Sequence, residues 1–255
     1  MAGSGMSHVL LELGQPAAWP LALRDYLSAY SDLFVKWESA TGEVQAAAYD
    51  EAIYGLVAVL QLYTMVGWHC TRLTEAEIDK VLDTGMQLPD GTMLRHRIEG
   101  LTQTGVMTND IALQLVLRNQ ADDKNRVGMI WFCFFSPRLA GESGVGRFFR
   151  HWGGEALYNS HESNPVTSPV LRCIGTPCLV EAEVPIASFA RHEGLAFKIV
   201  HSFLMSHGFP NSESIVHEDR IRLPLQADCV RRVIRFSEPD FSDLTGCADW
   251  RRPLC

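Results

Sequence analysis

The sequence predicts an α+β fold in which a helical N-terminal segment precedes a domain of strands and helices. Three observations support this prediction. Residues 1–62 show helical spacing, the pattern becomes strand-like at Tyr63, and two short apolar strands follow near the end, at Ile221–Leu223 and Val230–Phe236. We therefore expect residues 1–62 to form a helical extension and residues 63–255 to form one further domain.

The composition is that of a globular protein. Of the 255 residues, 47% are hydrophobic and 20% are charged, which excludes wholesale disorder. The formal net charge of −8 disfavours binding of nucleic acid through overall charge, although a local basic patch stays compatible with a nucleic-acid substrate. The seven cysteines form no CxxC pair, and no secretory signal is visible, so we expect a cytoplasmic protein.

The N-terminal segment predicts two helices. Apolar residues from Leu23 to Trp37 recur on one helix face, and a second helix is expected over Val44–Leu60. The uncharged stretch Ala52–Thr71 approaches the length of a bilayer span, but polar residues interrupt it. We interpret it as a buried helix that runs into a core strand, and expect no membrane segment.

A strand, a capped helix and a glycine stop follow. Tyr63–Thr71 is rich in β-branched and aromatic residues, which predicts a strand. Thr74 and Glu77 have the spacing of a capping box, and Gly85 is placed to end the helix. The other expected elements are a loop over Leu88–Gly105, a helix over Asp110–Asn119, a central strand over Met129–Phe135, a helix over Gly144–Tyr158, a strand over Leu179–Val184 and a helix over Phe197–His207.

The sequence gives little evidence for the common catalytic motifs or for a metal-binding motif. Cys173 and Cys178 lack a second Cys/His pair, so we expect no metal site. There is no GxSxG motif, and adjacent residues such as His69 and Cys70 point to opposite faces of a strand. The glycine-rich run 141–146 follows a strand and could offer backbone N–H groups to an anion, but a simple connector explains it equally well.

Three separated segments together resemble the ADP-ribosyltransferase fold, in its poly-ADP-ribose-polymerase-like and diphtheria-toxin-like branch. They are Trp68–Arg72 with the capped helix and Gly85-Met86 behind it, Trp131–Ser136 followed by Ser143 and Phe148-Phe149, and His217–Ile221 followed by Val230–Phe236. The resemblance implies split antiparallel sheets with flanking helices. It also implies an enzyme that cleaves the bond between nicotinamide and ribose in NAD and transfers ADP-ribose.

The resemblance assigns roles to particular residues. Glu218 would stabilise the positive charge that develops on the ribose, and His69 would orient the dinucleotide. The other NAD-binding positions that it implies are the backbone of Cys70, the hydroxyl of Thr71, Arg72 near the diphosphate, the motif serines Ser136 and Ser143, and a ring that stacks on nicotinamide, taken from Phe148, Phe149 and Trp152.

The sequence departs from the family at two positions, because glycine is usual where Cys70 stands and tyrosine is usual at the stacking position. Glu213, Glu181 and Glu183 compete with Glu218. The acceptor would be a protein or a nucleic acid, the latter in a toxin-like or defence-type role. A nucleic-acid acceptor would suit a basic strip of Arg95, Arg97, Arg147, Arg150 and His151.

Other functions stay open at this stage. One alternative is a non-catalytic module of the same fold that binds NAD or ADP-ribose. Another is an RNA 2′-phosphotransferase-like enzyme, although that family leads with a basic motif around its histidine. A structural α/β protein, whose cysteine and tryptophan residues are simply core, is a further alternative.

Overall fold

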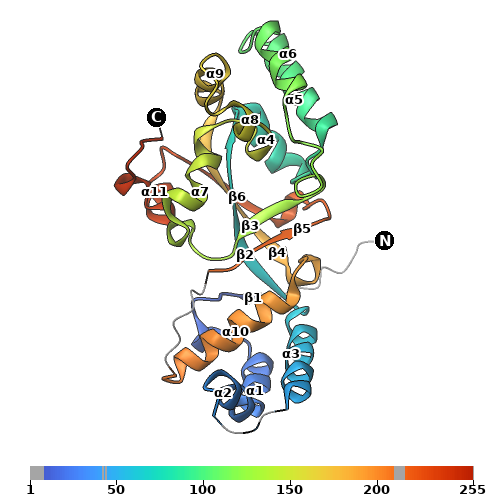
Figure 1. The fold of residues 1–255 in the computed structure, drawn as a ribbon, viewed down its shortest axis with the longest axis vertical. Coiled ribbons are helices and arrows are strands. Elements are labelled where there is room, and N and C mark those ends of the chain that lie inside the picture. Colours follow the sequence, from blue (N-terminus) through green and yellow to red (C-terminus); the bar gives the residue numbers. More distant parts are fainter. Residues whose placement is uncertain (1–8, 42, 44, 210–215, 255) are drawn as a thin grey trace.

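The computed structural model describes residues 9–41, 43, 45–209 and 216–254. Within these residues, the chain forms one mainly antiparallel sheet of six strands, together with eleven α-helices. The predicted α+β class is confirmed. Figure 1 shows an elongated molecule in which the sheet lies at mid-height between two groups of helices.

The sheet has the strand order β5-β3-β2-β4-β6, and β1 pairs with β2 in parallel. The long strand β2 is central, and its ladder with β4 extends from the pair Thr64–Pro185 to the pair Leu73–Thr176. The strands are β1 (Val9–Leu11), β2 (Tyr63–Leu73), β3 (Ile130–Cys133), β4 (Thr176–Pro185), β5 (Glu218–Ile221) and β6 (Val230–Arg235).

The lower group of helices in Figure 1 shares its core with the sheet. It contains α1 (Leu21–Ala29), α2 (Ser31–Glu38), α3 (Ala46–Leu60) and α10 (His192–Ser206). Leu23, Leu56 and Ile199 are fully buried in the same cluster as Phe132 and Val180 of the sheet. The helical extension is therefore packed directly against the rest of the chain.

The upper group of helices has a second core, built around the buried side chains of Leu94, Leu115 and Trp152. It contains α4 (Glu75–Thr84), α5 (Gly91–Gln103), α6 (Asn109–Leu117), α8 (Glu155–His161) and α9 (Thr167–Cys173). The remaining helices, α7 (Gly141–Arg150) and α11 (Pro239–Thr245), cover one face of the sheet, where Phe149 and Phe241 pack on Cys70 and Leu179.

Several predicted elements need correction. The expected loop over Leu88–Gly105 contains helix α5, whose first turn is capped by the Asp90 carboxylate. The expected helix over Gly144–Tyr158 is two helices: α7 ends at Arg150, where His151 is extended, and Gly153 and Gly154 adopt positive φ angles in the turn that leads into α8. The helix expected from Leu23 to Trp37 is also two helices, which meet at Tyr30.

The uncharged stretch Ala52–Thr71 behaves as expected, since α3 ends at Leu60 and β2 begins at Tyr63. Among the described residues, no helix has the length and apolar character needed to cross a membrane. The strand expected at Ile221–Leu223 instead spans Glu218–Ile221, because only these residues pair with β3.

Candidate functional site

The three motif segments lie on neighbouring strands. The first is in β2, the second in β3 and the third in β5, and these strands are consecutive in the sheet. Local sequence pattern predicted each strand but not this adjacency, which depends on pairing between segments far apart in the chain. The candidate site is therefore located at these three neighbouring strands.

The ladder between β2 and β3 is short. Its single residue pair is Trp68–Cys133, whereas β2 stays paired with β4 as far as Leu73. Just beyond Trp68, the Nδ1 atom of His69 lies 2.9 Å from the carbonyl oxygen of Trp131. A side chain thus replaces the next backbone contact, and the two strands separate there. We call this place the β2–β3 opening.

The backbone of Cys70 faces the β2–β3 opening. In an antiparallel ladder, alternate residues direct both backbone polar groups to the same neighbouring strand. Phe134 donates its N–H to the carbonyl of His217 at 3.0 Å, on the β5 side, so the preceding residue, Cys133, faces β2. Cys133 pairs with Trp68, which therefore faces β3, and Cys70 faces the same way beyond the end of the pairing.

One row of side chains crosses the sheet on a single face. The strand register aligns Glu218, Cys133, Trp68, Glu181 and Arg232 across all five antiparallel strands. Residues paired across strands lie on the same face, so we call this the Glu218 face.

The register places His69 on the opposite face. Neighbouring residues on a strand point to opposite sides, so the face of Trp68 and Cys70 excludes the side chains of His69 and Thr71. The ring of His69 accordingly packs edge-on against Phe132, with 6.1 Å between centroids. The structure therefore does not bring His69 and Glu218 together on one face, as a catalytic pair in one cleft would require.

Cys133 and Cys70 lie near Glu218, and the Cys70 thiol is a poor nucleophile. The Sγ atom of Cys133 lies 3.9 Å from Oε1 of Glu218, whose side chain is exposed. A hydrogen bond with Cys133, together with burial, raises the pKa of the Cys70 thiol well above its usual value. A protonated thiol does not attack an electrophile efficiently, so the Cys70 side chain is a core group, and any ligand contact falls to its backbone.

His69 is neutral at physiological pH. Burial lowers the pKa of its imidazole, and nearby Arg97 lowers it further, while the hydrogen bond to Trp131 opposes them. Because a carbonyl oxygen only accepts, Nδ1 of this neutral ring must carry the proton and donate it to Trp131. This hydrogen bond links β2 and β3 just beyond the end of their backbone pairing.

Several other predicted binding residues are occupied within the fold. Arg72 is buried and donates to the carbonyl oxygens of Ile174 (2.7 Å) and Phe149 (3.1 Å), so its guanidinium does not face an open diphosphate site. The hydroxyl of Ser136 donates to the carbonyl of Leu244 at 2.8 Å. Thr71 is half-buried.

The aromatic candidates differ in accessibility. Phe149 and Trp152 are fully buried, so neither ring is open for stacking on a ligand. Phe148 is half-buried and meets Tyr158 edge-on, with 5.8 Å between centroids. Ser143 is exposed on α7, because the glycine-rich run 141–146 forms the first turns of this helix and not a separate loop.

The glutamates that compete with Glu218 for the catalytic role differ in burial and in ion pairing. Glu181 is buried on the Glu218 face, accepts a hydrogen bond from Nε1 of Trp68 at 3.3 Å, and pairs with Arg232 at 3.3 Å. Glu183 lies 3.8 Å from Arg231. Glu213 lies outside the described residues. The sequence predicts a strand over Leu179–Val184, but the burial of Glu181 depends on tertiary contacts that a strand pattern does not specify.

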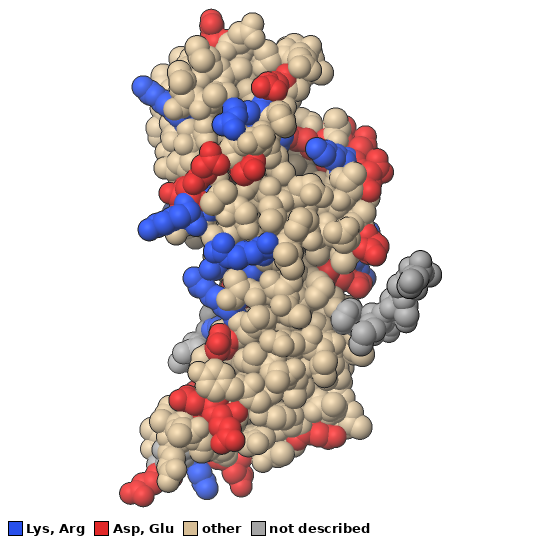
Figure 2. Space-filling view, turned by 90° about the vertical axis from the view of Figure 1, so that its right-hand side faces the viewer, with Lys and Arg blue, Asp and Glu red and all other residues tan. Residues whose placement is uncertain are grey.

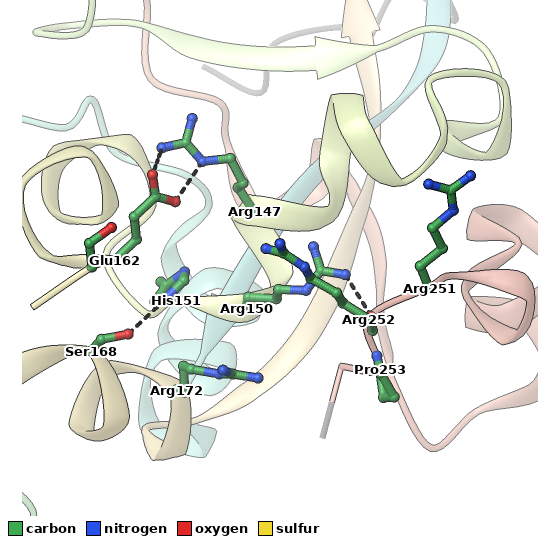
Figure 3. Close-up of a pocket in the computed structure, with 10 residues that line it drawn as sticks. Arg147, Arg150, His151, Glu162, Ser168, Arg172, Arg251, Arg252 and Pro253 are labelled. Carbon is green, nitrogen blue, oxygen red and sulfur yellow. Dashed lines mark hydrogen bonds and ion pairs between the residues drawn. The ribbon is translucent and has the colours of Figure 1, made fainter. Parts of the chain in front are cut away.

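The predicted basic strip is divided between different places. Arg97 pairs with Glu77 at 2.6 Å and stacks on Trp152, and Arg95 lines a shallow pocket beside α6. The other three members line one cavity of about 580 Å³, shown in Figure 3; they are Arg147, Arg150 and His151. Sequence reasoning missed the residues that complete this cavity, namely Arg172 of α9 and the C-terminal Arg251 and Arg252.

Surface charge is uneven despite the net negative charge. In Figure 2, basic side chains gather near the mid-height of the face shown, and acidic side chains lie above and below them. Within the described part of the chain, no group of three or more His, Cys, Asp or Glu side chains is arranged to hold a metal ion. In comparisons with known proteins, no family model, curated protein or solved structure matches this chain.

Proposed function

We propose that the chain is an NAD-dependent ADP-ribosyltransferase that binds NAD at the β2–β3 opening. The observation that carries this proposal is the adjacency of β2, β3 and β5, which turns three separated motif segments into one site. The backbone of Cys70, which faces β3 beyond the last pair of the β2–β3 ladder, supports it further. A strand edge with unpaired N–H and C=O groups can bind a carboxamide such as that of nicotinamide through two hydrogen bonds.

Glu218 is the proposed catalytic residue. Cleavage of the bond between nicotinamide and ribose develops positive charge on the ribose, and a carboxylate stabilises this charge most in the transition state. Glu218 is exposed, and it forms no ion pair with any described residue, so its carboxylate is available to a ligand. The ADP-ribose would then pass to a protein or nucleic-acid acceptor, as in toxin-like or defence-type enzymes.

The test is nicotinamide release from NAD by the full-length chain, with Glu218→Gln compared with wild type. Removing the carboxylate charge should lower release on the order of a hundredfold or more. The dissociation constant of NAD, measured by calorimetry, should change less than about twofold, because the amide keeps the shape of the side chain. Release that needs added cell extract would indicate transfer and not hydrolysis.

Glu183→Gln is the matched control, because this glutamate lies on the same sheet at a more remote strand. Release by this variant should equal that of wild type. If Glu218→Gln keeps full activity, the assignment of Glu218 is wrong. If it is Glu181→Gln that abolishes release, the buried glutamate of the same row takes its place.

A second candidate is a non-catalytic module that binds NAD or ADP-ribose. The separation of His69 and Glu218 onto opposite faces favours it, because a ligand on one face contacts only one of these side chains. This candidate predicts NAD binding by wild type without nicotinamide release, under the conditions of the same assay.

A further inference from the structure

A cavity of about 580 Å³ lies between α7, α8, α9 and the C-terminal segment. Helix α7 directs Val145 and Phe149 into the core beneath it, and its Arg147 and Arg150 line the cavity. In Figure 3, guanidinium groups from α7, α9 and the C-terminal segment gather around one space. The volume falls within the range of sites for small ligands.

Two of the arginines are already neutralised. Arg147 forms two hydrogen bonds with the carboxylate of Glu162, at 3.0 and 2.7 Å. Arg150 lies 2.5 Å from Glu142, whose carboxylate also accepts the backbone N–H of Arg251 at 2.8 Å. Glu142 therefore fixes the path of the C-terminal segment, and with it one wall of the cavity.

The charges of three other arginines are not compensated by a carboxylate of the described chain. No side-chain ion pair with a described residue is formed by Arg172, Arg251 or Arg252. All three residues are exposed, and all three line the cavity. Like charges gathered in this way repel one another, so the arrangement is stabilised when an anion enters. A ligand of two or three negative charges would match them.

A buried polar side chain also meets the cavity. His151 is only 6% exposed, and its Nδ1 atom is buried without a hydrogen-bond partner among the described residues. Its Nε2 atom lies 3.4 Å from the hydroxyl of Ser168. His151 and Ser168 therefore add polar groups to the wall of the arginine-lined cavity.

We propose that this cavity binds a small ligand that carries a diphosphate group. Guanidinium groups bind phosphate oxygens in pairs, and the unpaired arginines come from two separate elements, so they can grip two adjacent phosphates. A single carboxylate would leave two of the three charges uncompensated. The proposal does not depend on NAD cleavage, because inorganic pyrophosphate alone should bind.

The test is calorimetric titration of the full-length chain with inorganic pyrophosphate and with orthophosphate, at physiological ionic strength. Pyrophosphate should bind at least about tenfold more tightly than orthophosphate, because it engages more arginines. Arg172→Gln and Arg252→Gln should each weaken pyrophosphate binding about tenfold or more. No side-chain hydrogen bond of Arg172 or Arg252 is found among the described residues, so the melting temperatures of both variants should match that of wild type.

Arg24→Gln is the control, because Arg24 is exposed on α1 and its loss changes the net charge by the same amount. It should leave pyrophosphate affinity within about twofold. Absence of pyrophosphate binding to wild type would overturn the proposal, and so would binding that Arg172→Gln and Arg252→Gln leave unchanged. The result is separate from the nicotinamide assay, since it uses neither NAD nor Glu218.

Discussion

At the scale of single residues, Glu77 joins three parts of the upper helical group. Its carboxylate accepts hydrogen bonds from the backbone of Thr74 at 2.8 Å and from Nε1 of Trp152 at 3.1 Å, and pairs with Arg97 at 2.6 Å. Burial alone would raise the pKa of Glu77, but the pair with Arg97 and the hydrogen bonds outweigh it and lower the pKa. The capping box was predicted from sequence, whereas the partners Arg97 and Trp152 were not.

We expect Glu77→Gln to destabilise the protein by about 2 kcal/mol at pH 7, because a buried charge-assisted bond is lost. The folded-state pKa of Glu77 lies below its unfolded value of 4.5, so its contribution is complete above that pH. It is lost as pH falls through the folded pKa. Urea unfolding at pH 7 and at pH 3.5 checks this, and an equal difference at both values would contradict it.

At the scale of elements, helix ends determine which predictions succeed. Helix α4 was predicted correctly because its start and stop are local, at Thr74 and Gly85. Helix α5 was missed because the loop prediction over Leu88–Gly105 did not take account of the cap at Asp90. The break between α7 and α8 was missed because the prediction of one helix over Gly144–Tyr158 did not take Gly153 and Gly154 as breakers, although both adopt positive φ angles.

Gly85 gives a test at this scale. Its φ angle is +76°, and an added Cβ atom would meet the carbonyl oxygen of Leu225 at 2.0 Å, where the chain forms an isolated β-bridge with Met86. We expect Gly85→Ala to destabilise the protein by about 3 kcal/mol or more, from backbone strain and displacement of this bridge. Chemical unfolding followed by circular dichroism measures the change.

Gly100→Ala is the matched control. Gly100 is exposed inside α5, and no atom lies within 4 Å of an added Cβ. Alanine has the higher helix propensity, so this variant should gain about 0.5 to 1 kcal/mol. Equal effects of the two substitutions would show that local geometry at Gly85 does not limit stability.

At the scale of the whole molecule, the predicted boundary at residues 62 and 63 falls between α3 and β2, yet the core crosses it. Leu56 of α3 and Phe132 of β3 are buried in one cluster, and Val9 pairs with Tyr63. Sequence periodicity identified both parts but could not show that they share a core, since amphipathic faces do not specify their partners.

Leu56→Ala tests whether the two parts unfold together. Loss of this fully buried side chain should cost about 3 kcal/mol, from lost burial and the cavity that remains. Tryptophan fluorescence and far-ultraviolet circular dichroism should shift together in one transition. Two separate transitions, of which only one moves, would show that the N-terminal helices unfold independently.

The two candidate sites differ in how far sequence could predict them. The motif segments around Trp68, Trp131 and Glu218 were identified, but the face of each side chain depends on register, which separated His69 from Glu218. The cavity itself was not predicted, although three of its lining residues, Arg147, Arg150 and His151, belong to the predicted basic strip. The other arginines of the cavity are Arg172, Arg251 and Arg252. Their positions depend on tertiary contacts, such as the hydrogen bonds of Glu142 with the C-terminal segment.

The central position of β2 has a consequence for biosynthesis. Leu73 pairs with Thr176, so a ribosome must add about a hundred residues before the ladder with β4 begins to form. During that interval Tyr63–Leu73, which is apolar and rich in β-branched and aromatic residues, has as partner strands only the short β1 and, once residue 133 has been added, the single pair with β3. Nascent chains should therefore need shielding from one another, and low temperature or slow translation should raise the yield of folded protein.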